Sequence, residues 1–236
     1  MKPADAPPPD RLRLPRVVAI DGPSASGKGT LSRRLAAELG FAYVDTGAMY
    51  RTLAWWALRN GLRLSLPMTA AHDRAVIRLM RSWNWDLREI DRQVWLHVEG
   101  YFPAAEIRTD AVEKAAAVVA QIGRVRDWMV ARQRECVRFG PLVMEGRDIG
   151  TEVFPLATVK FFLDADADER QRRFASRGGS SDVRQRDGLD QNRRQGALVR
   201  ALDAVCVDST RQTEDETFDR MRQAVAGRLA ALPAGA

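Results

Sequence analysis

The chain has 236 residues, 45% of them hydrophobic, and 37 Lys and Arg against 31 Asp and Glu give it a net charge of +6 at pH 7. A chain of this length can bury one substantial core, and no apolar run approaches the roughly 20 residues that a membrane span needs. We therefore predict one globular domain with no membrane partner.

Two further features of the composition indicate a cytoplasmic protein. Residues 1–12 are rich in proline and lack the apolar core of a signal peptide, so we expect a disordered tail. Cys136 and Cys206 lie far apart and form no metal-ligand pattern. We expect reduced thiols, as in cytoplasmic proteins.

Nearly all the positive charge is arginine, since the lysines are only Lys2, Lys28, Lys114 and Lys160. Arginine binds planar oxyanions bidentately, so the excess fits a site that holds several phosphates. Coding bias, with arginines on solvated helix faces, explains most of them equally well. Nucleic-acid binding is the other interpretation of a basic chain. The charges alternate in sign and carry no interleaved aromatics, so we predict no nucleic-acid partner, although composition alone does not decide.

A glycine-rich segment follows the apolar run at 17–20 and precedes a helical pattern that opens at Lys28 or Gly29. A strand, a glycine-rich turn and a helix N-terminus form a phosphate cradle, because free backbone N–H groups and the helix dipole favour anions. An ordinary glycine-rich turn would not also carry Lys and Thr in these places. The predicted ATP-binding loop consists of Gly22, Pro23, Ser24, Ala25, Ser26, Gly27, Lys28, Gly29 and Thr30.

Within this loop, Lys28 is expected to reach the outer phosphates and Thr30 to bind Mg²⁺. The hydroxyl residue stands one position later than in the usual Walker A pattern, after Gly29. That Gly-Lys-Gly-Thr variant is typical of small-metabolite kinases of the nucleoside monophosphate type.

The next segments repeat the strand–turn–helix unit. Residues 41–44 are predicted to form a strand, and residues 45–47 cap a helix at 48–59. Repetition of this unit predicts a parallel sheet with crossover helices.

Residues 61–108 break that rhythm. A helix at about 70–81 is followed by two alternating stretches, 83–87 and 94–98, with a turn between them. We expect a small three-stranded antiparallel insert, whose tryptophans belong to its core rather than to a stacking platform because they alternate with polar residues.

The remainder alternates helices with buried strands. Helices are predicted from 110 to Gly123, at 125–138, at 167–177 and at 183–202, strands at 142–144, 158–163 and 204–207, and a flexible stretch at 178–182. Thr213 and Glu216 are spaced as a capping box for the C-terminal helix. In open parallel sheets, ligands bind at the carboxyl ends of the strands, so Glu145 and the residues after it are expected beside the phosphate loop.

Over residues 15–232 the chain resembles the bacterial cytidylate kinases. The resemblance rests on six segments in the right order, which are 22–30, 45–51, 107–109, 124–126, 145–151 and 186–193. It implies an α/β fold, with a parallel sheet flanked by helices, over a single P-loop kinase domain at 13–236. It further implies an inserted NMP-binding subdomain at 61–108, a short helical lid at 166–182, and transfer of the γ-phosphoryl group of ATP to CMP or dCMP.

The resemblance also implies a role for each matching residue. Phosphoryl transfer needs positioning and charge neutralisation more than covalent help, so an array of arginines suits it. The acceptor phosphate would be held by Arg51, Arg147 and Arg193, the cytosine edge by Arg126 and Asp148, and the ribose by Arg186 and Asp190, with Thr46 near the nucleotide. The catalytic group would be Lys28, Arg147, Arg170 and Arg173, the last two as lid arginines, and Glu145 would hold Mg²⁺ through water.

The chain departs from the family pattern at three places. Ala117 stands where well-known members have a serine that contacts the base, Glu145 where many have aspartate, and Leu189 where a polar residue is usual. The lid is also shorter than in the longest members. Losing one hydroxyl would weaken cytosine binding or relax base discrimination by roughly 0.5 to 1.5 kcal/mol.

Two alternatives stay open at this point. A kinase of another small acceptor, such as shikimate or uridylate, would have no reason to carry Arg126 and Asp148 together with the 186–193 set. A regulatory NTP-binding or nucleic-acid-binding protein would need the phosphate loop but no second arginine set. Nothing in the sequence demands oligomerisation, so we expect a monomer.

Overall fold

The structure is a computed structural model, and it describes residues 16–66, 69–176, 178 and 182–231. The predicted tail at 1–12 and most of the predicted flexible stretch at 178–182 lie outside these residues. No helix among them is long and apolar enough to cross a membrane.

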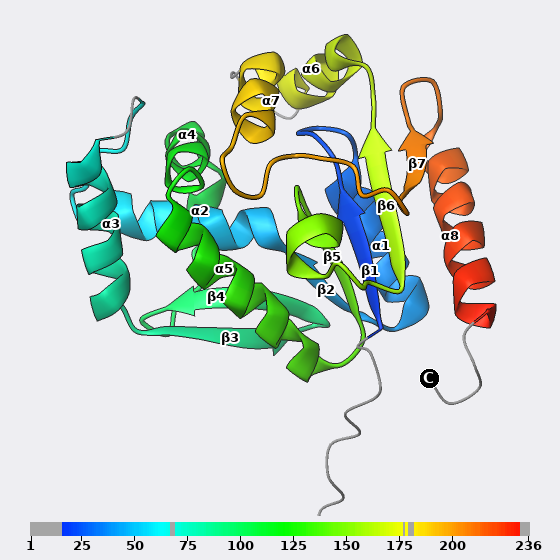
Figure 1. Cartoon of the computed structure of the whole chain (residues 1–236), viewed down its shortest axis with the longest axis horizontal. Coiled ribbons are helices and arrows are strands. Elements are labelled where there is room, and N and C mark those ends of the chain that lie inside the picture. Colours follow the sequence, from blue (N-terminus) through cyan, green and yellow to red (C-terminus); the bar gives the residue numbers. More distant parts are fainter. Residues whose placement is uncertain (1–15, 67–68, 177, 179–181, 232–236) are drawn as a thin grey trace, which may run out of the picture.

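One sheet runs through the molecule in the order β3-β4-β2-β5-β1-β6-β7 (Figure 1). Among the strand pairs of the described residues, only β3–β4 is antiparallel, whereas the others are parallel. The predicted α/β class with a mostly parallel sheet is therefore confirmed. The strands are β1 (Val17–Asp21), β2 (Ala42–Asp45), β3 (Trp85–Ile90), β4 (Gln93–Val98), β5 (Leu142–Gly146), β6 (Val159–Asp164) and β7 (Val205–Asp208).

Helices cover both faces of the sheet, and the alternation of side chains along β1 shows how. Val17 and Ala19 face one apolar core, shared with α2, α4 and α5, while Val18 and Ile20 face a second core, shared with α1 and α8. The helices are α1 (Lys28–Leu39), α2 (Thr46–Arg59), α3 (Ala70–Ser82), α4 (Asp110–Val119), α5 (Gly123–Glu135), α6 (Ala167–Ala175), α7 (Val183–Gln191) and α8 (Glu214–Ala230).

Local signals set several helix ends. Helix α1 opens at Lys28, as predicted, and ends at Gly40, whose φ of +66° suits glycine. Helix α2 starts two residues earlier than predicted, because the Asp45 carboxylate caps it by accepting a hydrogen bond from the Ala48 amide at 2.8 Å. The capping box of Thr213 and Glu216 at α8 is confirmed.

The predicted three-stranded insert is wrong in its strand count. It contains two strands, and β4 also pairs in parallel with β2, so the hairpin extends the main sheet. Residues 106–108, where the third strand would have to come, form a 3₁₀ turn instead. The tryptophans of the insert are core residues rather than a stacking platform, as predicted, but they belong to the main core: Trp83 is buried in the core that α2, α4 and α5 share, and Trp85 and Trp95 pack against it.

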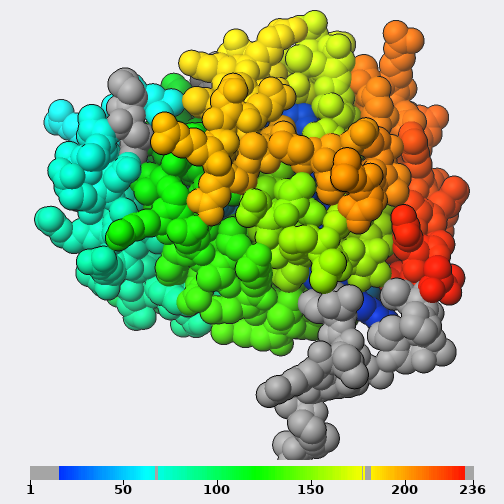
Figure 2. Space-filling model, viewed as in Figure 1, coloured from blue at the N-terminus to red at the C-terminus, as the bar shows by residue number. Residues whose placement is uncertain are grey.

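The predicted helix at 183–202 is also too long, since α7 ends at Gln191. Residues 192–204 then run across the face of the molecule to β7 (Figures 1 and 2). The Leu198 amide donates to the Asp190 carbonyl at 2.9 Å, and Gly196 has a φ of +61°. A hydrogen bond back to α7 and a left-handed residue are incompatible with a continuing helix. The helix predicted at 167–177 is also too long, since α6 ends at Ala175.

Candidate active site

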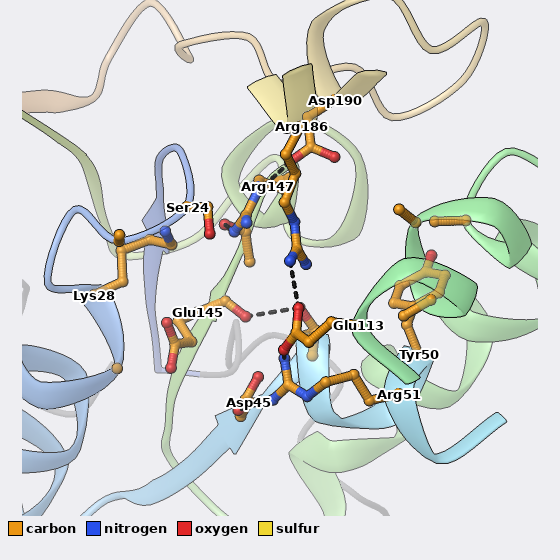
Figure 3. A pocket seen from close by; sticks show the side chains of 18 of the residues that line it. Ser24, Lys28, Asp45, Tyr50, Arg51, Glu113, Glu145, Arg147, Arg186 and Asp190 are labelled. Atoms are coloured by element: carbon orange, nitrogen blue, oxygen red, sulfur yellow. Dashed lines mark hydrogen bonds and ion pairs between the residues drawn. The ribbon is translucent and has the colours of Figure 1, made fainter. Parts of the chain in front are cut away.

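A pocket opens at the carboxyl ends of β1, β2 and β5 (Figure 3). It brings together most of the residues to which the sequence assigns a role, although they come from segments more than 160 residues apart. Those that line it are Ser24, Ala25, Gly27, Lys28, Gly29, Thr46, Arg51, Arg126, Glu145, Arg147, Asp148, Arg186, Asp190 and Arg193. Gly22, Pro23, Ser26 and Thr30 belong to the same loop but do not line the pocket.

The phosphate loop is held tightly at its start. Gly22 has a φ of +151°, and a Cβ there would overlap the carbonyl oxygen of Leu163. The Lys28 ammonium donates to the Pro23 carbonyl at 2.5 Å and to the Ser26 hydroxyl at 3.3 Å. Burial, reinforced by the Arg147 charge, lowers the pKa of Lys28 to about 7. The loop therefore holds a cation whose charge a bound anion would stabilise.

Asp21 connects the end of β1 to the turn that follows β5. Its two carboxylate oxygens accept hydrogen bonds from the Ile149 and Gly150 amides, at 2.8 and 2.7 Å. Burial raises the pKa of Asp21 to about 6. Since Arg147 and Asp148 immediately precede this π-helical turn (Ile149–Val153), Asp21 fixes the backbone that carries both.

Glu145 lies at the end of β5, close to the first turn of α1. The Tyr43 hydroxyl donates to its carboxylate, and the Thr46 hydroxyl donates to its carbonyl at 2.7 Å. Burial, together with the Asp45 charge, raises the pKa of Glu145. A Cβ placed on Gly29 would come within 3.1 Å of Glu145 Oε1, so this carboxylate stands directly over the start of α1.

Two carboxylates organise the arginines assigned to the acceptor phosphate. Asp190 accepts from Arg147 Nε at 2.7 Å and also from Arg193, and its side chain is only 2% exposed. Asp45 pairs with Arg51 at 2.8 Å. The three guanidiniums are thus held by one buried carboxylate, Asp190, and one partly buried carboxylate, Asp45, rather than extended into solvent.

The residues assigned to the cytosine edge form one buried pair. Arg126 donates to Asp148, and among the described residues its Nε and Nη1 have no hydrogen-bond partner. Gly196 lies against this pair, since a Cβ there would overlap the Arg126 guanidinium and the Asp148 carboxylate. Arg126 and Asp148 both line the pocket, and a polar ligand that reached the two unpartnered donors would satisfy them.

Glu113 is a pocket residue to which the sequence assigned no role. It projects from α4 between Arg51 and Arg186, as Figure 3 shows, pairing with Arg186 and lying 3.6 Å from Arg51 Nη1. Burial alone would raise its pKa, but the Arg186 and Arg51 charges hold it below its usual range.

The two arginines assigned to the lid lie outside the pocket lining. Arg170 is buried, where it donates to the Ala165 and Ser24 carbonyls and pairs with Asp187 at 2.6 Å. Arg173 pairs with Glu169 and donates to the Ser209 carbonyl at 2.8 Å. Helix α6 instead contributes Phe174 to the pocket.

Most of the chain matches known proteins in sequence. The cytidylate kinase family model matches residues 18–226. The chain belongs to the cytidylate kinase family. A cytidylate kinase from Nocardia farcinica (strain IFM 10152) is 42% identical over 228 residues, which cover 91% of this chain and 95% of that protein. One from Geobacillus kaustophilus (strain HTA426) is 39% identical over 224 residues, 90% of this chain and 97% of that protein.

A solved structure, TT1252 from Thermus thermophilus, aligns with 92% of this chain over 99% of its own length, with 18% identity and a TM-score of 0.48. A likeness at that level adds nothing to the assignment.

Sequence reasoning assigned no role to three residues of the site, Asp21, Glu113 and Phe174. Asp21 could have been found from its place between a buried strand and the glycine-rich loop. Glu113 stands four residues before Ala117, and residues four apart share a helix face, so the expected position of Ala117 at the base could have indicated it. Phe174 carried no such signal.

Proposed function

We propose that this kinase transfers the γ-phosphoryl group of ATP to CMP or dCMP, giving ADP and CDP or dCDP. The observation that carries the proposal is that one pocket holds two differently built halves. One is a glycine-rich loop with Lys28, and the other is an arginine set that ends in the Arg126–Asp148 pair. A donor and an acceptor can therefore meet with their phosphates between the two halves.

The residues act by positioning and by neutralising charge. Lys28 and the loop amides hold the donor phosphates, while Arg51, Arg147 and Arg193 hold the acceptor phosphate opposite them. Arg126 and Asp148 present a donor and an acceptor to the polar edge of cytosine, and Arg186 and Asp190 bind the ribose. Holding two reactants in line replaces a bimolecular encounter, and fixed cations stabilise the charge that develops on the transferred group.

The residues present also fit Mg²⁺, which prefers oxygen ligands and retains several waters. The Glu145 carboxylate lies close to Gly29, the residue before Thr30, so the Glu145 carboxylate and the Thr30 hydroxyl would both supply oxygen ligands at this part of the site. When bound, the ion would neutralise charge on the donor phosphates. Thr30 would hold it directly and Glu145 through water.

Helix α6 is proposed as the part of the lid that contacts the phosphate loop. Its Phe174 lines the pocket, and Arg170 donates to the Ser24 carbonyl on the phosphate loop at 3.3 Å. Arg170 and Arg173 would approach the donor phosphates only by exchanging their present partners for them. The insert, with α3 and the β3–β4 hairpin, is proposed as the acceptor-binding subdomain. We further propose that the protein is cytoplasmic and has no nucleic-acid partner. We also propose that it is a monomer, which a molar mass from light scattering tests.

Initial rates with CMP, dCMP, UMP, AMP and GMP test the proposed acceptor, with ADP release as the readout. CMP and dCMP should far exceed the other acceptors in kcat/KM. Asp148→Asn should reduce this preference, whereas Asp215→Asn, which loses an exposed charge, should leave it unchanged. A clear preference of the wild type for another monophosphate would contradict the proposal. ADP release that does not depend on any acceptor would indicate a regulatory NTP-binding protein instead.

A further inference from the structure

On the acceptor side of the pocket, three carboxylates lie beside the arginines that would bind the acceptor. Asp45 already pairs with Arg51, and Asp190 already pairs with Arg147 and Arg193. Glu113 adds a third anion, directed at Arg51 and Arg186 (Figure 3).

Glu113 is a fixed part of the pocket wall. Its side chain is 21% exposed and lines the pocket, and its helix is anchored in the core by Val112, Ala115 and Ala116. One carboxylate oxygen lies toward Arg51 and the other accepts from Arg186, so both are directed at guanidiniums.

We infer that Glu113 competes with the acceptor nucleotide, and above all with its phosphate, for Arg51 and Arg186. The inference rests on the proposed acceptor site, because it takes Arg51 to bind the acceptor phosphate and Arg186 the adjoining ribose. A carboxylate between two guanidiniums carries a negative charge and accepts from the same N–H donors that would bind a phosphate there.

Arg51 and Arg186 differ in the ion pairs that remain to them when the Glu113 carboxylate moves away. Arg51 remains paired with Asp45, whereas Glu113 is the only ion-pair partner of Arg186 among the described residues. A phosphate that binds Arg51 must therefore either move the Glu113 carboxylate or bind beside a like charge. Both weaken binding, and both apply far less to a neutral nucleoside.

Calorimetric titration of CMP and of cytidine, without a phosphoryl donor, tests the inference. In Glu113→Gln, CMP should bind about tenfold more tightly than in the wild type, by the scale of a hydrogen bond to a charged group. Cytidine should change by less than about threefold on the same scale, because its hydroxyls do not compete as an anion does. Glu38→Gln, on the exposed surface of α1, loses the same charge and should change neither affinity.

Two results would overturn the inference. CMP binding that is unchanged or weaker in Glu113→Gln would mean that Glu113 positions the arginines instead of competing for them. An equal gain for cytidine would mean a general loosening of the pocket. Thermal unfolding of Glu113→Gln, and of Glu113→Ala as a second variant, establishes that each is folded, and Glu113→Ala should shift CMP affinity in the same direction.

Failure of the proposed acceptor is separable from failure of this inference. If the wild type prefers another monophosphate over CMP, the proposed acceptor is wrong. The comparison of Glu113→Gln with the wild type is then made with that monophosphate and its nucleoside. A selective gain for the monophosphate still supports competition by Glu113, and the lack of one rejects it.

Discussion

Replacing Asp190 by asparagine removes the charge that holds two arginines of the acceptor site. The Asp190 side chain is 2% exposed, and it pairs with Arg147 at 2.7 Å and with Arg193. Breaking a buried ion pair from one side costs about 3–5 kcal/mol, because the partner charges stay buried and unpaired. Arg147 is 19% exposed and can be partly solvated, so we expect a loss of about 2–4 kcal/mol in the free energy of unfolding.

Chemical denaturation and thermal melting measure this loss directly. For a chain of this size, about 2–4 kcal/mol corresponds to a Tm lower by about 4–16 °C. Asp215→Asn is the matched control, because Asp215 makes an exposed ion pair with Arg34, in which the two side chains are 80% and 41% exposed. An exposed pair contributes about 0–1 kcal/mol, so this control should melt within about 4 °C of the wild type.

The effect should also depend on pH with a definite sign. Although burial opposes it, the Arg147 and Arg193 charges hold the pKa of Asp190 below 3.8 in the folded protein. A carboxylate with a lowered folded pKa stabilises the fold above its unfolded value, and this contribution is lost as the pH falls through the folded value. The difference between wild type and Asp190→Asn should be constant from about pH 5 to 8 and shrink below about pH 4. Equal losses in Asp190→Asn and Asp215→Asn would refute the reasoning.

Two further predictions concern the donor and acceptor halves of the pocket. Because burial lowers the pKa of Lys28 to about 7, ATP binding at pH 7.5 should take up as much as about 0.8 proton, measured from titration enthalpies in buffers of different ionisation enthalpy. Lys28→Met should abolish that uptake, and uptake that persists would show that another group titrates. Ala117→Ser, which returns a hydroxyl to a residue lining the pocket, should lower KM for CMP by about two- to tenfold without raising kcat. If KM is unchanged or higher, the hydroxyl does not reach the base.

The features that the sequence predicted well depend on local signals. The phosphate loop is defined by a buried strand, two glycines and Lys28 within a dozen residues, and α1 begins where that pattern places it. The strand at 142–146 likewise has no polar residue before Glu145, as expected of a buried strand. The carboxyl ends of parallel strands lie at one edge of the sheet, so Glu145 is expected beside the loop.

Features that depend on distant segments were predicted less well. The hairpin was recognised from alternation, but its place in the main sheet follows from the pairing of Val44 with Val94, 50 positions along the chain. Residues 192–202 contain Arg, Gln, Ala and Leu, which favour helix, yet Gly196 is held against Arg126 and Asp148. That tertiary contact overrides the local preference.

The contacts of side chains in the site also depend on distant segments. Glu113 acquires its partners only because α4 lies between Arg51 of α2 and Arg186 of α7. Three elements must be in place before its role can be stated, and the sequence contains no single pattern that joins them.

The contact of Gly196 with the Arg126–Asp148 pair has a consequence for how acceptor preference can evolve. Any side chain at position 196 would collide with both groups and face a left-handed backbone at φ +61°, so this part of the wall cannot be remodelled by single substitutions. Helix α4 and its C-cap residue, by contrast, present the small residues Ala116, Ala117 and Ala120 to the pocket, where larger or polar side chains can be tried one at a time. Divergence toward other bases, natural or engineered, should therefore accumulate on α4 while position 196 remains glycine.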